Sequence, residues 1–294
     1  MQIIPGQIKT AQLHNYLQGA IAPRPICFAS TVDKNGNPNL SPFSFFNLFG
    51  SNPPTLIFSP SRRVRDNTTK HTLENVLETM EVVINVVNYA MVQQASLASC
   101  EYPKGVNEFE KAGFTPQPSE KVKPFRVKES PVQFECIVRE VRPQGTEGGA
   151  GNLIICEPVL IHINDAILNE NGAIDPHKID LVARMGGDYY CRASGAAVFE
   201  VAKPLTELGI GIDALPSAIR QSNILTGNNL GQLANVQQQP TVDPAFDDDH
   251  LKNIIQYYSI TPDEMEKELH RHAQRLLEQG RVQDAWQVLL AGTI

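Results

Sequence analysis

Two β-type segments near the N-terminus are joined by a turn that makes them antiparallel neighbours. Residues 26–32 have the alternating pattern of a strand, and Asn35-Gly36 follows them within a short polar stretch. Asn-Gly is the strongest short hairpin signal. We therefore predict a partner strand at residues 39–46. Strands linked this closely cannot begin a βαβ unit, which needs a long crossover.

The remaining segments continue this pattern with few helices. We predict further strands at residues 55–59, 81–87, 132–141 and 153–164, and short helices at residues 10–18, 72–80 and 91–99. Residues 103–124 are predicted to be a loop. The glycine-rich residues 145–151 precede a strand, so a hairpin loop is favoured over a dinucleotide-binding loop. The pattern predicts a mainly β fold with some α structure, namely an antiparallel barrel decorated by short helices.

The sequence changes character after residue 202. Three regions are predicted: a barrel domain at residues 1–202, an extended arm or linker at 203–242, and a C-terminal α-helical appendage at 243–294. Within the appendage, helices are predicted at residues 250–258 and 282–290. Between them, Thr261 is the expected N-cap of a third helix that has Pro262 at its first position, Glu264 completing a capping box, and Gly280 at its end.

The end of the appendage resembles one helical-hairpin repeat unit, spanning residues 272–290. A single pair of such helices cannot bury its own apolar face, because repeat arrays usually need about three units or more. We therefore expect the pair to pack on the barrel, on a dimer mate or on another protein.

Charge is unevenly distributed. The chain has 25 basic and 32 acidic residues, a net charge of −7. This balance argues against a nonspecific nucleic-acid binder. Residues 243–294 contain ten acidic and five basic residues, a net charge of −5, which leaves −2 for the other 242 residues.

The sequence predicts a cytoplasmic protein without a membrane segment. The N-terminal residues lack the basic and apolar pattern of a secretory signal, and no apolar stretch approaches the roughly 20 residues that span a bilayer. The five cysteines are an odd number without a CxxC pair, which argues against a disulfide framework and a zinc site. His270 and His272 would face apart on a helix, so no metal site is expected.

Residues 41–47 are the first candidate for a binding site. On one continuous strand, Ser41, Phe43, Phe45 and Asn47 would share a face. Pro42 cannot donate to a sheet ladder and so predicts an edge strand. Hydroxyls and an amide among aromatic rings would suit a planar heterocycle. The alternative is a core strand with incidental serines.

Residues 59–72 are the second candidate. They carry four basic residues and one acidic residue, a local charge of +3, and a helix is predicted to start directly after them. Thr69 or Thr72 would cap that helix. A helix N-terminus with basic and hydroxyl side chains suits a phosphate dianion. The alternative is a solvated basic loop.

Five segments in the same order resemble the flavin reductase-like family, the FMN-binding split-barrel group that includes flavoredoxins and reductase components of two-component monooxygenases. The segments lie at residues 22–26, 30–47, 70–75, 102–113 and 184–190, and the last has the pattern Arg-Met-Gly-Gly-x-x-Tyr. The resemblance covers roughly residues 1–200. His71 and Asn107 depart from the family pattern, which usually has Asp at the first position and commonly at the second.

The resemblance implies a Greek-key split barrel, a homodimer and one FMN per protomer near the dimer interface. Its motifs assign FMN contacts to the following residues of this sequence: Ser41, Phe43, Ser44, Asn47, Arg62, Lys70, Thr72, Ser99 and Tyr102. Arg184 and Tyr190 would contact NADH or NADPH. No metal is implied, and no catalytic residue is assigned.

Two hypotheses follow for the function. The first is an NAD(P)H-dependent oxidoreductase in which hydride passes to FMN and electrons then pass to an acceptor, such as a monooxygenase partner. The second is a flavoredoxin-like electron carrier or FMN-binding module without NAD(P)H activity, whose helical tail docks a partner. Hydride transfer to a flavin needs no protein nucleophile, so the missing catalytic triads do not count against the first.

Overall fold

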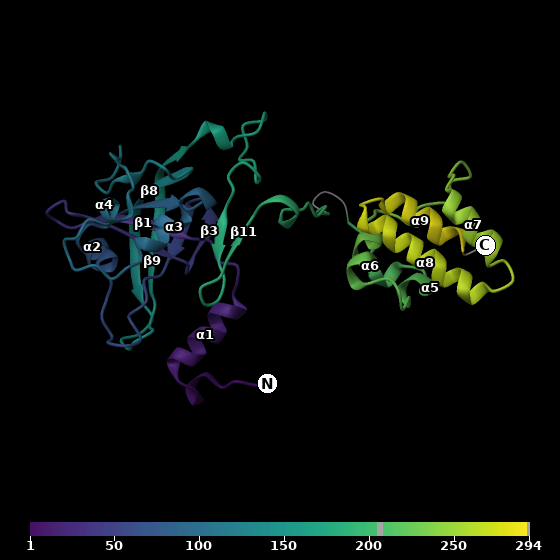
Figure 1. Cartoon of the computed structure of the whole chain (residues 1–294), viewed down its shortest axis with the longest axis horizontal. Helices are drawn as coiled ribbons and strands as arrows, with labels where there is room; N and C mark the ends of the chain where they lie inside the picture. Colours follow the sequence, from purple (N-terminus) through teal and green to yellow (C-terminus); the bar gives the residue numbers. More distant parts are fainter. Residues whose placement is uncertain (205–207, 293–294) are drawn as a thin grey trace. The chain divides into compact units, whose positions relative to one another are not determined.

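The predicted hairpin is present in the computed structural model, which describes residues 1–204 and 208–292. β1 (Cys27–Val32) and β2 (Pro38–Phe43) pair antiparallel, with Val32 opposite Pro38 and Cys27 opposite Phe43. The chain divides into two units, Met1–Phe199 and Glu200–Ile294 (Figure 1). The first unit contains the β structure and the second is helical.

The first unit is built on a seven-stranded antiparallel sheet in the order β2-β1-β5-β8-β9-β4-β3. Its other strands are β3 (Phe46–Ser51), β4 (Pro54–Phe58), β5 (Glu81–Val86), β8 (Val132–Pro143) and β9 (Asn152–Ile163). Residues 145–151 form the expected hairpin loop between β8 and β9. β2 and β3 are the two edges of this sheet, yet only Ser44 and Phe45 join them. The sheet must therefore curl until its edges meet, and no ladder among the described residues pairs β2 with β3. This is an open, or split, barrel, as expected.

The strand expected at residues 39–46 is shorter than predicted. β2 ends at Phe43, and Asn47 belongs to β3 at the opposite edge of the sheet. The expectation that Ser41, Phe43, Phe45 and Asn47 share one strand face was therefore wrong, because the chain crosses between edges at Ser44 and Phe45. The inference from Pro42 was right, since β2 is an edge strand.

The barrel unit also contains short helices. They are α1 (Thr10–Ala20), α2 (His71–Thr79), η2 (Tyr89–Met91), α3 (Val92–Leu97) and α4 (Glu108–Ala112). α4 interrupts the loop predicted at 103–124. Its signal was Asn107, whose side chain accepts a hydrogen bond from Phe109 N as the N-cap. The cap expected from Thr69 or Thr72 is absent, because Lys70 is the N-cap of α2 and makes no side-chain cap bond.

Small elements complete the first unit. They are η1 (Pro5–Gln7), β6 (Pro116–Gln117), β7 (Arg126–Val127), η3 (Asp165–Ile167), β10 (Val182–Arg184), β11 (Tyr190–Arg192) and η4 (Gly195–Ala197). β10 and β11 form a separate hairpin, which a backbone bridge between Arg24 and Arg184 links to the segment before β1.

β1 is buried on both faces, and four of its six residues are apolar, whereas Ser30 and Thr31 are buried polar residues. Cys27 and Ala29 point into the barrel interior with Phe58, whereas Phe28 packs with Phe109 under α4. The barrel interior also holds two further cysteines, Cys136 and Cys156, and burial raises the pKa of all three thiols well above the usual value. These three cysteines are core residues, and all five cysteines are free.

The second unit is a helical domain with its own core. Its elements are η5 (Ile212–Ala214), α5 (Ser217–Arg220), α6 (Gly227–Ala234), α7 (Asp249–Tyr257), α8 (Pro262–Glu278) and α9 (Val282–Ala291). Pro262 begins α8 as expected, but the Thr261 side chain makes no capping bond there. Thr261 Oγ1 instead donates to the Tyr258 carbonyl. Gly280, with φ of 74°, separates α8 from α9.

The helical pair at residues 272–290 packs on residues of its own unit, which were not among the partners that we expected. Leu215, Ile219, Leu225 and Leu233 lie in one apolar cluster with the fully buried Trp286. The Trp286 Nε1–H donates to the Leu233 carbonyl at 3.2 Å. The predicted arm, residues 203–242, thus supplies α5 and α6 to this core, although residues 205–207 of the arm and 293–294 of the appendage lie outside the described part.

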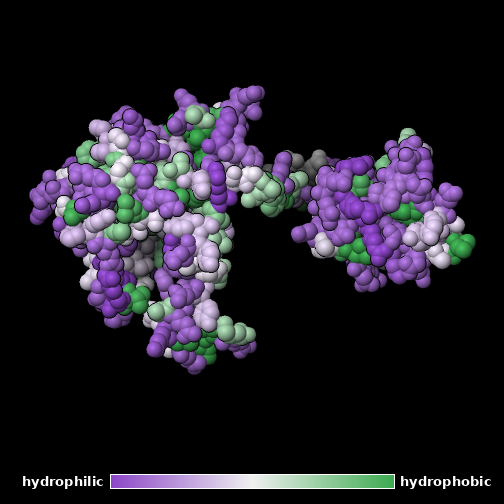
Figure 2. Space-filling view, in the orientation of Figure 1, coloured by the Kyte–Doolittle hydropathy of each residue, from purple (hydrophilic) through white to green (hydrophobic). Residues whose placement is uncertain are grey.

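The surfaces in view are mostly hydrophilic, with hydrophobic residues in small groups (Figure 2). No helix within residues 1–204 and 208–292 is long and apolar enough to cross a membrane. The same residues contain no group of three or more His, Cys, Asp or Glu side chains that could hold a metal ion.

Candidate functional site

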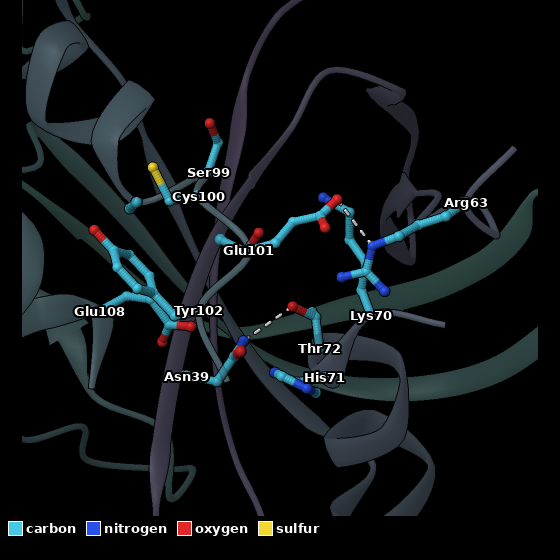
Figure 3. Close-up of a pocket in the computed structure, with 12 residues that line it drawn as sticks. Asn39, Arg63, Lys70, His71, Thr72, Ser99, Cys100, Glu101, Tyr102 and Glu108 are labelled. Carbon is cyan, nitrogen blue, oxygen red and sulfur yellow. Dashed lines mark hydrogen bonds and ion pairs between the residues drawn. The ribbon is translucent and has the colours of Figure 1, made fainter. Parts of the chain in front are cut away.

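Two adjoining cavities on the barrel unit share Lys70 and Ser99. The smaller, of about 30 Å³, is lined mainly by polar residues: Asn39, Ser41, Arg63, Lys70, His71, Thr72, Ala98, Ser99, Cys100, Glu101, Tyr102 and Glu108 (Figure 3). The larger, of about 280 Å³, is lined by Gln18, Ile26, Pro42, Phe43, Ser44, Lys70, Val92, Ala95, Ser96, Ser99, Arg184 and Tyr190. We call these the polar cavity and the wide cavity.

Arg63 is held in the polar cavity by its own loop. Its Nη1 donates to Thr68 Oγ1 at 2.8 Å and to the Thr69 carbonyl at 2.7 Å, and its Nε lies 3.1 Å from Glu101 Oε1. The hairpin loop between β8 and β9 packs closely against the backbone of Arg63 and Val64. A Cβ on Gly148 would lie 3.0 Å from the Arg63 carbonyl oxygen, so only glycine fits without displacement.

Lys70 reaches both cavities without an anionic contact of its own. Its Nζ lies 5.1 Å from the centre of the Phe43 ring, and among the described residues it makes no recorded hydrogen bond or ion pair. Desolvation lowers the pKa of Lys70, the charge of Arg63 lowers it further, and Glu101 acts in the opposite direction. A partly buried ammonium group in this state favours an incoming anion.

A chain of side-chain amides and hydroxyls positions Thr72. Asn39 Nδ2 donates to Thr72 Oγ1 at 2.9 Å and to Thr31 Oγ1 at 3.3 Å, and Asn75 Nδ2 donates to the same Thr31 oxygen at 3.1 Å (Figure 3). Because the Thr72 hydroxyl accepts from Asn39, its own hydrogen is left to donate to a ligand in the cavity. Thr72 is therefore a second donor beside Lys70.

Two acidic side chains, Glu101 and Glu108, also line the polar cavity. Glu108 is buried and accepts from Leu40 N at 3.0 Å, and desolvation raises its pKa above the usual value. Glu101 extends from the segment after α3 towards Arg63 and Lys70 (Figure 3). Ser99, on the same segment, is fixed by donation from its Oγ to the Ser96 carbonyl at 2.6 Å.

The wide cavity has cationic groups around it and no carboxylate among its lining residues. Arg184 Nη1 donates to Tyr190 OH at 2.6 Å, and its guanidinium lies 4.7 Å from the centre of that ring. Arg24 lies behind the lining, with its Nε 3.4 Å from Ser44 Oγ. Its pKa is lowered by desolvation and by the charge of Arg184. An electron-rich or anionic group in this cavity would meet a positive potential.

The structure brings together nine of the eleven predicted site residues. Ser41, Lys70, Thr72, Ser99 and Tyr102 line the polar cavity, and Phe43, Ser44, Arg184 and Tyr190, with Lys70 and Ser99, line the wide one.

Asn47 and Arg62 line neither cavity. Asn47 is exposed on β3, where its Oδ1 accepts from Leu48 N at 2.8 Å. Arg62 fixes the basic loop through Asn67, donating to its Oδ1 at 2.6 Å and to its carbonyl at 2.7 Å. The neighbouring Arg63, from the same basic loop, takes the place in the cavity that the family resemblance assigned to Arg62.

Sequence reasoning missed several lining residues. Asn39 had a usable signal, because it lies two residues before Ser41 and therefore on the same strand face. Arg63 lay within the predicted basic loop, but the sequence does not distinguish it from Arg62. Glu101 and Gln18 had no comparable signal, because they reach the cavities only through the packing of α1 and of the segment after α3.

Comparisons with known proteins give one matching family model and a similar protein of comparable length to the first unit. A family model described as the flavin reductase like domain matches residues 20–178. An uncharacterized protein from Aquifex aeolicus is 39% identical over 201 residues, which is 68% of this chain and all of that protein.

Two solved structures resemble the first unit. One is nitrilotriacetate monooxygenase component B from Bacillus cereus, with 28% identity and a TM-score of 0.63 over 68% of this chain and 98% of that chain. The other is a Shewanella frigidimarina protein with a split barrel domain, with 28% identity and a TM-score of 0.57 over 67% of this chain and 96% of that one.

Proposed function

The chain belongs to the flavin reductase-like domain family, and from this premise we propose that its two cavities together hold one FMN, with NADH or NADPH as the electron donor. The protein would then be an NAD(P)H-dependent FMN oxidoreductase. The observation that carries this proposal is Lys70, a partly buried ammonium group that faces both cavities without an anion of its own.

The residues present fit the parts of FMN. Arg63, Lys70 and Thr72 offer two positive charges and a hydroxyl donor, which suit a phosphate dianion. The adjoining wide cavity combines apolar Phe43 and Ala95 with small hydroxyl residues, which suits a flat heterocycle with polar edges. Because both cavities share Lys70 and Ser99, a phosphate in one and a ring in the other can belong to one ligand.

FMN, when bound, would accept hydride from the nicotinamide nucleotide and pass electrons to an acceptor. The side chains of this protein would bind and orient the ligands. Arg24, Lys70 and Arg184 would favour negative charge in the wide cavity. Arg184, fixed by Tyr190, would contact the nucleotide.

Association with other chains is part of the proposal. Similarity to a monooxygenase component B supports a partner protein as electron acceptor. Exposed Leu48 and Phe49 on β3, with Val159, Ile161 and Ile163 on β9, offer apolar area for a homodimer. We propose a cytoplasmic homodimer in which residues 1–202 form the flavin-binding domain.

Binding of FMN by the purified full-length protein is the first test. FMN should bind, and Lys70→Met should weaken its binding by about tenfold or more, since a charge-assisted hydrogen bond contributes about 1.5–3 kcal/mol. Riboflavin, which lacks the phosphate, should be affected less. Lys104→Met is the control, because exposed Lys104 pairs with Glu74 and lines neither cavity. Failure of the wild-type protein to bind FMN would contradict the proposal.

Anaerobic addition of NADH or NADPH to the FMN-loaded protein separates the two functional hypotheses. Rapid loss of the oxidised-flavin absorbance supports a reductase and identifies the preferred nucleotide. Persistence of that absorbance with both nucleotides, with FMN still bound, would favour the flavoredoxin-like electron carrier.

A further inference from the structure

Glu101 places a carboxylate among the cations of the polar cavity. Its Oε1 lies 3.1 Å from Arg63 Nε, and its Oε2 pairs with Arg65. Figure 3 shows its side chain extending towards Arg63 and Lys70. Two of these three cations, Arg63 and Lys70, line the polar cavity, whereas Arg65 does not.

A bound phosphate would need Arg63, which Glu101 now contacts, and Lys70, towards which Glu101 extends. Arg63 and Lys70 are the cationic side chains that line the cavity. The hydrogen bond from Arg65, followed by the charge of Arg63, lowers the pKa of Glu101, so the carboxylate is ionised at neutral pH. Two anions at the same cations repel each other, so phosphate and Glu101 compete.

The Glu101 side chain is partly exposed and has a second cationic partner, Arg65, which does not line the polar cavity. Its side chain is 45% exposed, and that of Arg65 is 66% exposed. Arg63 is held to its loop by Thr68 and Thr69 and so remains in the cavity. Glu101 can therefore leave Arg63 while it stays paired with Arg65 outside the cavity.

We propose that Glu101 is a displaceable counter-ion of the phosphate subsite, and that it lowers the affinity of the site for FMN and shortens the residence time of bound FMN. This inference rests on the proposed binding of FMN. Binding replaces the Arg63–Glu101 contact with an Arg63–phosphate contact, and release restores it. The residue thus sets affinity and residence time through the phosphate alone.

The test compares FMN and riboflavin on full-length variants. Glu101→Gln keeps the shape of the side chain and removes its charge. It should tighten FMN binding roughly fivefold, the equivalent of one exposed ion pair, mainly through slower dissociation. Riboflavin affinity should stay unchanged. Glu157→Gln is the matched control, since it removes the same charge from an exposed pair with Arg139 that lines neither cavity.

A second variant tests whether Glu101, once displaced from Arg63, stays paired with Arg65. Arg65→Met removes the outer partner, so Glu101 should stay on Arg63 and FMN should bind more weakly than to wild type. In the double variant with Glu101→Gln, the Arg65 substitution should have no effect on FMN binding.

The outcomes are distinguishable. FMN affinity that is unchanged or weaker in Glu101→Gln would overturn the inference, as would an equal change for riboflavin. Those results would leave the proposed function intact, provided that wild type binds FMN. If neither wild type nor Glu101→Gln binds FMN, the proposed function itself fails.

Discussion

Glu135 on β8 links this strand to the segment at residues 120–121 and to β9. Its side chain is fully buried in β8. It accepts hydrogen bonds from the backbone N–H groups of Glu120 at 3.0 Å and Lys121 at 2.6 Å, and lies 2.7 Å from His162 Nε2 on β9. Desolvation by itself raises the pKa of Glu135, but these bonds outweigh it, and the net shift is downward.

We expect Glu135→Gln to lower the free energy of unfolding by about 1.5–3 kcal/mol at neutral pH, the range for hydrogen bonds to a charged group. Because the pKa is lower in the folded state, the carboxylate stabilises the fold above its unfolded pKa. That contribution is lost as the pH falls through the folded pKa. Urea unfolding of both proteins should therefore show a difference that shrinks towards acid pH.

Glu157→Gln serves again as the control for the loss of one charge. Its pair with Arg139 is exposed, so its effect on unfolding should stay within about 0.5 kcal/mol. A difference between wild type and Glu135→Gln that is constant from neutral to acid pH would contradict the role given to the Glu135 carboxylate.

Among the elements, α1 is attached to the barrel in an unusual way. It has no buried residue of its own, so apolar packing contributes little to its position. The Arg24 guanidinium donates to the carbonyls of Gln18 at 2.5 Å and Ile21 at 2.6 Å, near the end of the helix, and to that of Met185 at 2.9 Å. A cation at a helix C-terminus satisfies carbonyls that have no partner within the helix. Since Gln18 lines the wide cavity, Arg24 positions one wall of the site.

Arg24→Met should therefore release α1 without unfolding the barrel. We expect faster amide hydrogen exchange over residues 10–20 and several-fold weaker binding of riboflavin, because one wall of the wide cavity becomes mobile. The measurement is hydrogen exchange by mass spectrometry, together with a riboflavin titration. Arg192→Met is the control, as Arg192 pairs with Asp180 and has no contact with α1. Unchanged protection of α1 would show that other contacts hold it.

For the molecule as a whole, the two units each have a core. The helical unit buries Trp286 among residues from both the predicted arm and the predicted appendage. The barrel unit contains all residues of both cavities. Binding of flavin and folding of the helical unit should therefore be separable.

Two truncations test this separation. A chain that ends at Phe199 should bind FMN with unchanged affinity. A chain that ends at Gln239 should aggregate, because it keeps Leu233 and its apolar neighbours but lacks α8 and α9, which cover them. Size-exclusion chromatography and an FMN titration measure both effects. Loss of FMN binding in the shorter chain would show that the helical unit contributes to the site.

Much of the local structure could be predicted from the sequence. The Asn-Gly hairpin, the antiparallel strands, the starts of the last two helices and the edge position implied by Pro42 are all confirmed. These features depend on φ preferences and on the spacing of apolar residues, which neighbouring residues determine. The sequence also singled out Ser41, Phe43, Lys70 and Thr72, but only the family resemblance implied that they share one ligand; in the structure they line adjoining cavities.

Other features were decided only by tertiary structure. The crossing at Ser44 and Phe45 depends on closure of the sheet, and it removes Asn47 from the cavities. Arg63 faces the polar cavity because Asn67 holds Arg62 while Glu101, from a distant segment, meets Arg63. Part of the predicted arm forms α5 and α6, because its leucines bury their apolar area against α8 and α9. Such outcomes depend on contacts between residues far apart in the chain, whereas sequence periodicity reports only on neighbours.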